Sequence, residues 1–214
     1  MKIFLTLLLM CCITAGVFAQ KKFEGVVTYS ATYKSHIANV TDDQIRHYFG
    51  ATQLFYVKGA NSKYEYPNSL WMKWSLFVPK EKRVYDMQVK SDSALWYSVV
   101  VDHDTIAKTE LKKNDTTILG YPCDRVTFTS KDGMQQVYYY NAKFAIDPEL
   151  YADFKEVNYY DYLKIAKAVA LKVVFIGHDF TETMIATEIK PMPLDDKLFE
   201  LPPGINIGKN NQRD

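Results

Sequence analysis

Hydrophobic and polar residues alternate through most of the first two-thirds of the chain. In residues 69–78, apolar side chains stand at every second position from Leu70 to Val78, with Lys73 and Ser75 between them. A period of two is typical of a β-strand with one buried face. Turn-forming residues interrupt this pattern at intervals of roughly 8–12 residues, which is typical of a meander, sandwich or barrel. The predicted strands of this region are 23–33, 52–58, 63–66, 69–78, 83–89, 94–101 and 105–111.

The clearest local signal lies in residues 114–140, which predict a turn, a strand, a tight turn and a second strand. Gly133 can take the left-handed conformation that a three-residue hairpin loop requires. If the loop runs from Lys131 to Gly133, Val126 shares a face with Tyr138. A slip of one residue moves Tyr138 to the opposite face, and the sequence leaves both registers open.

A short helix is predicted after the first strand. Thr41 is a good N-cap, and Gln44 three residues later completes a capping box. The helix is expected to run from Asp42 to about Phe49, because Gly50 supplies a typical C-terminal stop.

The pattern changes in the last third of the chain. Asp147 followed by Pro148 predicts a helix start, and residues 158–167 predict a second short helix. Residues 169–176 form a strongly apolar strand, which we expect to pair with residues 181–190.

Residues 1–19 are typical of a secretory signal peptide. Lys2 supplies the basic start, Ile3–Val17 the apolar core, and Ala19 the end of a small-residue cleavage site. A membrane anchor is the alternative, but the apolar stretch is too short for one. We therefore expect export to the periplasm, with secretion as the alternative. The expected organisation is a signal peptide over 1–19, one domain over 20–207 and a disordered tail over 208–214.

Charge narrows the classes of partner. The chain has 26 basic and 25 acidic residues, so removal of Lys2 with the signal peptide leaves 26 − 1 = 25 basic residues against 25 acidic ones. No basic block or acidic tail stands out. This balance argues against nucleic acid binding and against a surface held electrostatically to a membrane. The charge balance does not exclude binding of an apolar ligand. No transmembrane segment is expected after signal cleavage.

The three cysteines predict no internal disulfide. Cys11 and Cys12 are expected to leave with the signal peptide. A lipidation signal would place a small residue directly before the cysteine, which neither position has. Cys123 then stands alone, and a buried packing role is favoured over a reactive thiol.

No motif predicts catalysis, a metal site or a cofactor. The four histidines are His36, His47, His103 and His178, and none lies in a metal-binding pattern. His103 between Asp102 and Asp104 is a candidate for binding a cation, although a solvated turn explains the same residues. A hydrolase stays a third hypothesis that lacks any recognisable pair of nucleophile and base.

The strands carry many aromatic side chains, some of them on both faces. Strands 69–78 and 94–101 place large apolar residues on either side, so each face must be covered or must face an apolar ligand. Core packing and cavity lining both remain open for these positions. The candidates for a ligand cavity are Trp71, Trp74, Phe77, Trp96, Val126, Phe128, Tyr138, Tyr140 and Phe175.

Three predicted turns repeat the order of an Asp, a hydroxyl residue and a small or apolar residue. This order resembles the acceptor for general protein O-glycosylation in the envelope of some Gram-negative bacteria. The same pairs are common in ordinary turns. The candidate acceptors are Ser93, Thr105 and Thr116.

Two blocks carry a resemblance to a known family. The sequence I-L-G-Y-P-C ends at Cys123, and L-F-E-L-P-P-G closes the domain at Leu198 to Gly204, after an F-E-G-x-V strand from Phe23 to Val27. In this order the chain resembles a domain-of-unknown-function family of Gram-negative envelope proteins. That family is related in fold to the LolA/LolB-type lipoprotein carriers, whose concave apolar cavity holds lipoprotein acyl chains.

The resemblance implies a mainly antiparallel β fold with short helices (β+α): a LolA-like curved half-barrel sheet with helices in the concave face. It implies a non-catalytic periplasmic protein that holds a lipid or a lipoprotein acyl chain. The alternative is a structural or interaction protein of the cell envelope with a filled core and no ligand. The ligand, the partners and the oligomeric state stay open at this point.

Overall fold

The computed structural model describes residues 22–101 and 105–213. The predicted signal peptide, with Cys11 and Cys12, and His103 lie outside the described residues. The described chain forms a single sheet with the strand order β12-β6-β5-β4-β3-β2-β1-β11-β10-β9-β8-β7.

The described residues contain twelve strands, two α-helices and four 3₁₀ turns. The elements are β1 (Gly25–Ser35), α1 (Asp42–Phe49), β2 (Thr52–Lys58), β3 (Asn61–Glu65), β4 (Met72–Val78), η1 (Pro79–Glu81), β5 (Arg83–Gln88), β6 (Ser93–Ser98), β7 (Ile106–Ile118), β8 (Tyr121–Ser130), β9 (Gln135–Ala145), η2 (Pro148–Tyr151), η3 (Glu156–Asn158), α2 (Tyr159–Ala166), β10 (Ala168–Ile176), β11 (Phe180–Pro191), η4 (Asp196–Phe199) and β12 (Asn206–Lys209).

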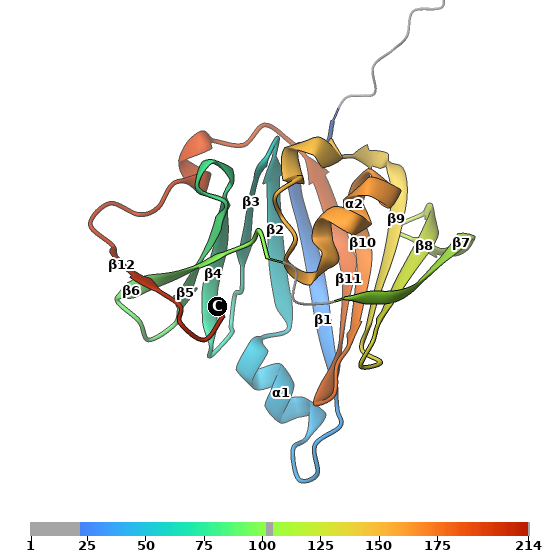
Figure 1. Cartoon of the computed structure of the whole chain (residues 1–214), viewed down its shortest axis with the longest axis horizontal. Helices are drawn as coiled ribbons and strands as arrows, with labels where there is room; N and C mark the ends of the chain where they lie inside the picture. Colours follow the sequence, from blue (N-terminus) through green and yellow to red (C-terminus); the bar gives the residue numbers. More distant parts are fainter. Residues whose placement is uncertain (1–21, 102–104, 214) are drawn as a thin grey trace, which may run out of the picture.

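The sheet is strongly curved, and Figure 1 shows α2 with the segment before it lying across β9 and β10. Every neighbouring pair of strands is antiparallel except β12 and β6, which are parallel. The predicted fold class, mainly antiparallel β with short helices and a curved half-barrel sheet, is therefore confirmed.

The two predicted helical regions take different places. Helix α2 packs into the concave side, whereas α1 lies at the lower end of the sheet beside β1 (Figure 1). The helix predicted from Asp147 is only a 3₁₀ turn, η2, although the Asp147 side chain does accept a hydrogen bond from the Glu149 backbone. The chain cannot continue as one helix because Val157 and Asn158 adopt left-handed backbone conformations.

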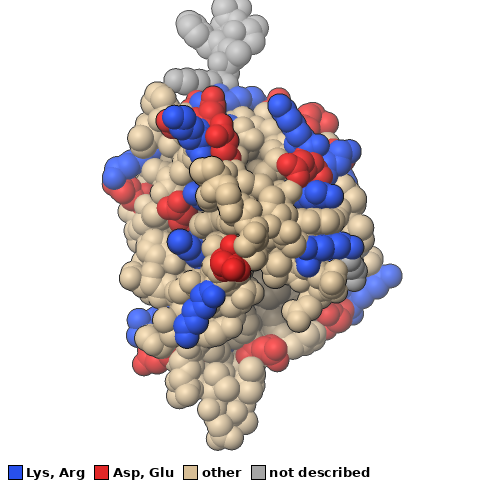
Figure 2. All heavy atoms as spheres, turned by 90° about the vertical axis from the view of Figure 1, so that its left-hand side faces the viewer, with Lys and Arg blue, Asp and Glu red and all other residues tan. Residues whose placement is uncertain are grey.

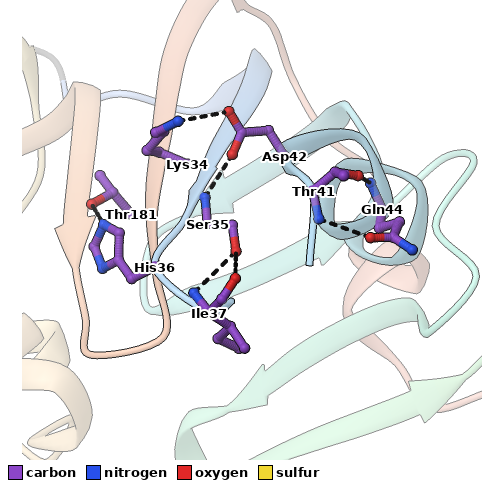
Figure 3. Close-up of polar contacts among 8 residues, drawn as sticks. All are labelled: Lys34, Ser35, His36, Ile37, Thr41, Asp42, Gln44 and Thr181. Carbon is purple, nitrogen blue, oxygen red and sulfur yellow. Dashed lines mark hydrogen bonds and ion pairs between the residues drawn. The ribbon is translucent and has the colours of Figure 1, made fainter. Parts of the chain in front are cut away.

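Helix α1 has the predicted boundaries and the predicted capping box. The Thr41 backbone N–H donates to Gln44 Oε1 at 2.8 Å, and the Gln44 N–H donates to Thr41 Oγ1 at 3.2 Å (Figure 3). Asp42 then ties the helix to β1, because its carboxylate accepts the Ser35 N–H at 2.8 Å and lies 3.4 Å from Lys34 Nζ. The Ser35 hydrogen bond, the largest cause, together with Lys34 lowers the pKa of Asp42.

The hairpin of β8 and β9 settles the register that the sequence left open. Val126 pairs with Tyr138, and Ser130 bonds to Met134 across a loop that contains Gly133. The loop is therefore the three-residue one, and Gly133 has the positive φ of 91° that was expected. Val126 and Tyr138 both belong to the main core on the concave side.

One strand departs from simple alternation. The sequence predicts Met72 and Trp74 on one face, but the β4–β5 register shifts between these two residues. A β-bulge places one extra residue in a strand and so moves a side chain to the other face. Trp74 consequently packs on the convex side with Leu76 and Tyr85, while Met72 faces inward.

The C-terminal tail, predicted to be disordered over 208–214, begins with an ordered strand. Residues 206–209 form β12 and pair with the edge strand β6, and the Asn210 N–H donates to the Trp96 carbonyl at 2.8 Å. Disorder was predicted from the polar side chains of the tail. The backbone of the tail nevertheless pairs with β6, because an unpaired sheet edge offers hydrogen-bond partners to any backbone.

Charged side chains are mixed on the described surface. On the face in Figure 2, acidic and basic residues are interspersed, and no large patch of one sign stands out. No helix among the described residues has the length and apolar character that a membrane span requires.

Candidate ligand cavity on the concave face

A cavity of about 570 Å³ lies between the concave face of the sheet and the segment that leads into α2. Nine strands, β1 to β6 and β9 to β11, contribute inward-facing side chains to its wall, and Phe154, Glu156, Val157 and Tyr159 contribute from the segment before and at the start of α2. Phe49 and Trp71 line the end near α1. The cavity is thus built by the curvature of the sheet and is roofed by a segment of irregular structure.

Aromatic and aliphatic side chains form most of the wall. The aromatic members are Tyr29, Tyr33, Phe49, Phe55, Tyr64, Tyr66, Trp71, Phe77, Tyr97, Tyr138, Phe154, Tyr159, Phe175 and Phe180. The aliphatic members are Met72, Val84, Val157, Ala170, Val173 and Met184. Small-molecule pockets have walls of this kind, with a few polar groups that orient the ligand.

Several wall tyrosines are held by hydrogen bonds to the chain. The Tyr29 hydroxyl donates to the Ala170 carbonyl at 2.6 Å, which links β1 to β10 across the concave face. Burial raises the pKa of Tyr29, so the hydroxyl stays protonated.

Ring stacking also orders the wall. Phe55 and Tyr64 stack with their ring centroids 4.3 Å apart. The aromatic wall is therefore fixed in place by specific contacts.

Four of the nine residues predicted from sequence line this cavity: Trp71, Phe77, Tyr138 and Phe175. The remaining five take two other places. Val126, Phe128 and Tyr140 are buried in the main core. Trp74 and Trp96 belong to the cluster on the convex side, where the Arg83 guanidinium lies 3.6 Å from the centre of the Trp96 ring.

Helix α2 explains why only part of the concave face is open. Tyr162 and Leu163 are fully buried, and the Tyr162 ring stacks on Tyr138 with centroids 4.2 Å apart. The Tyr162 hydroxyl donates to the Ala168 carbonyl at 2.8 Å. The helix therefore covers part of the inner face of β8, β9 and β10, and the cavity occupies the rest of the concavity, from β6 through β1 to the uncovered parts of β10 and β9.

A polar group stands inside the apolar wall. Glu182 on β11 lies between Phe180 and Met184 on the inward face, and all three line the cavity. Glu182 Oε1 accepts hydrogen bonds from the Tyr33 hydroxyl at 3.0 Å and from Gln53 Nε2 at 2.8 Å. Desolvation raises the pKa of Glu182 above its usual value of 4.5, although both hydrogen bonds oppose that shift.

A second carboxyl lies behind the opposite part of the wall. Asp86 on β5 is buried and accepts a hydrogen bond from Ser75 Oγ at 2.5 Å, and Ser75 itself lines the cavity. Desolvation raises the pKa of Asp86 as well. Near it, Arg213 from the C-terminal segment lies 4.4 Å from the centre of the Tyr97 ring and 3.5 Å from Glu156.

Glu182 is a site residue that the sequence analysis missed. The signal was present, because Glu182 occupies an inward position between two apolar residues of an alternating strand. Charged residues are almost never buried unless they are paired. An acid at such a position therefore points to a built polar contact.

The raised pKa of Glu182 makes a prediction about stability and pH. The native state binds more protons than the unfolded state between the usual value of 4.5 and the raised value, so the carboxyl loses its stabilising effect as pH rises through that window. The free energy of unfolding of Glu182→Gln is therefore expected to increase relative to that of the parent as pH rises from 4.5 to 8. Urea unfolding at both pH values measures the difference, with the exposed Glu188→Gln as control. A difference that does not change with pH contradicts the prediction.

Other chemistry predicted from single residues has little support in the described geometry. No group of three or more His, Cys, Asp or Glu residues comes together among the described residues. Cys123 is buried, and desolvation raises the pKa of its thiol, which disfavours the reactive thiolate. Of the candidate O-glycosylation acceptors, Thr105 is exposed, while Ser93 and Thr116 are partly buried.

No protein-family model matches the chain, and no curated protein matches it. Among solved structures it is similar to an uncharacterized conserved protein from Thermus thermophilus, with a TM-score of 0.49 and 11% identity over 87% of this chain and 91% of that one. It is also similar to the LolA superfamily protein NE2245 from Nitrosomonas europaea, with a TM-score of 0.41 and 10% identity over 86% of this chain and 92% of that one. A third is LprF from Mycobacterium bovis, with a TM-score of 0.29 and 12% identity over 84% of this chain and 91% of that one.

Proposed function

We propose that this protein is a non-catalytic binding protein that holds a lipid or an acyl chain in the cavity on its concave face. The observation that carries the proposal is the cavity itself, with a volume of about 570 Å³ and a mainly aromatic and aliphatic wall. Pockets for small molecules have volumes of roughly 300–1,000 Å³. The alternative, an envelope protein with a filled core, is disfavoured because this space is large enough for a ligand.

The wall favours binding over chemistry. Its polar side chains are Gln53, Ser62, Ser75, Gln136, Glu156, Glu182 and Arg213, and no histidine or cysteine is among the described lining residues. Glu182 is already engaged by Tyr33 and Gln53. The one lining serine that donates to a carboxyl, Ser75, donates to Asp86, and no histidine lies among the described lining residues to serve as the general base of an acyl-transfer site.

Export supports a role in the cell envelope. The signal-like segment over residues 1–19 is the sequence feature that directs a protein out of the cytoplasm. Localisation in the periplasm fits a carrier or a binding protein of the cell envelope. The alternative localisation is outside the cell. In either compartment a lipid is carried through water inside a protein cavity, because exposure of its apolar chain to water is costly.

The proposal predicts that the purified chain without residues 1–19 binds the neutral fluorescent probe N-phenyl-1-naphthylamine at one site, with an increase in fluorescence. The physical reason is the transfer of the probe from water to the apolar wall. Native mass spectrometry and solvent extraction of protein from its own host then identify any bound lipid. A protein that carries no lipid and leaves the probe in water contradicts the proposal.

A further inference from the structure

We infer that Glu182 contacts the polar head group of the ligand and sets its selectivity. The preferred ligand is an amphiphile whose head group donates hydrogen bonds, an amine or a hydroxyl, rather than one that carries a carboxylate or a phosphate. This inference rests on the proposed function and names the class of ligand for the same cavity. It is carried by the position of Glu182, by the direction of its hydrogen bonds and by the sign of the charges around the cavity.

The position of Glu182 places a carboxyl among apolar neighbours. Phe180 and Met184 flank it on the inward face of β11, and Phe175 is its partner on β10. A carboxyl in such a place loses its water and gains from any donor that a ligand brings. An apolar chain that lies along this wall therefore meets one strong acceptor.

The protein satisfies only part of this acceptor. Tyr33 and Gln53 both donate to Oε1 of Glu182, and Oε2 receives no hydrogen bond from the described residues. A carboxylate can accept about four hydrogen bonds on its two oxygens. Oε2 is not one of the fully buried side-chain atoms that lack a hydrogen-bond partner, so it remains accessible. The free capacity of the carboxyl thus remains open to a donor in the cavity.

The charges of the wall agree with a donor head group. Arg213 is the only basic residue among the described lining residues, and its guanidinium lies 3.5 Å from Glu156. Asp86 adds a further acid behind Ser75. An anionic head group would face like charges at Glu182 without a free cation, whereas an ammonium would form a charge-assisted hydrogen bond there. Selection of this kind combines one attractive contact with repulsion of the wrong ligand.

The test compares head groups on one chain length. Tetradecylamine, tetradecanol and tetradecanoate, each below its micelle concentration at pH 7.5, displace N-phenyl-1-naphthylamine from the purified protein. The expected order of affinity is amine, then alcohol, then acid, with at least a tenfold difference between the amine and the acid. In Glu182→Gln the affinity for the amine, expressed relative to the affinity for the neutral probe in the same variant, is expected to fall at least tenfold.

The control is Glu188→Gln, an exposed acid of the same strand that pairs with Lys190 at 2.8 Å outside the cavity. It should keep the order of the parent protein. Probe binding with equal displacement by the three amphiphiles, or an unchanged order in Glu182→Gln, overturns the inference and leaves the proposed function standing. Failure of the probe and of all three amphiphiles to bind overturns both. If far-UV circular dichroism shows that Glu182→Gln is unfolded, the order in the parent protein decides.

Discussion

Val173→Trp is expected to weaken binding of N-phenyl-1-naphthylamine at least tenfold, while Val174→Trp leaves it unchanged. Val173 lines the cavity and pairs with Tyr138 on β9 and Met184 on β11, which are lining residues too. An indole at this position projects into the space that the ligand needs. The adjacent Val174 points to the opposite face, because successive side chains of a strand alternate.

The two variants form a matched pair. Both place a tryptophan in the same strand, and aromatic residues are well tolerated in strands. Fluorescence titration gives the affinity, and thermal unfolding shows whether each variant is folded. Equal weakening by both substitutions would show that disturbance of the strand, and not occupation of the cavity, is responsible. Unchanged binding in folded Val173→Trp would place the ligand elsewhere on the protein.

Much of the fold could be predicted because several of its strands and helices are specified by patterns within consecutive residues. Strand β2 and helix α1 have the predicted boundaries, since alternation and a capping box are encoded in consecutive residues. The hairpin register was open because it depends on where the loop closes, and the sequence allowed two choices. The bulge between Met72 and Trp74 and the pairing of β12 with β6 depend on contacts between distant segments, so local pattern could not predict them.

The candidate site was harder to predict for a related reason. Trp71 and Trp74 are equally aromatic and three residues apart, yet Trp71 lines the cavity and Trp74 packs on the other face. Which face becomes concave is set by the curvature of the whole sheet. Tyr140 was a reasonable candidate on the correct face, but helix α2 covers it through Tyr162. Glu182 could not be recognised from an aromatic pattern, because it is an acid between Phe180 and Met184 in the inward row of β11.

Gly25→Ala is expected to have the largest effect on folding among the Gly→Ala substitutions at the described glycines. Gly25 has a φ of 154°, and a Cβ built there would lie 2.0 Å from the Lys190 carbonyl oxygen and 3.0 Å from Pro191 Cα. Both obstacles belong to the backbone of β11, so neither can rotate away. Strands β1 and β11 would have to separate at the pairing of Gly25 with Pro191. The glycine of the F-E-G-x-V strand is thus explained by the close approach of two strands.

The expected loss in free energy of unfolding exceeds about 3 kcal/mol, a large share of the roughly 5–15 kcal/mol that stabilises a typical domain. Gly133→Ala is the matched control. Gly133 also has a positive φ, 91°, but no atom lies within 4 Å of a Cβ at that position. The control should therefore lose only the conformational cost of about 1–2 kcal/mol. Urea unfolding of both variants measures the difference, and equal losses would show that backbone conformation alone, not contact with β11, requires glycine at position 25. Because β1 and β11 also carry Tyr33 and Glu182, a folded but loosened Gly25→Ala should bind the amine more weakly as well.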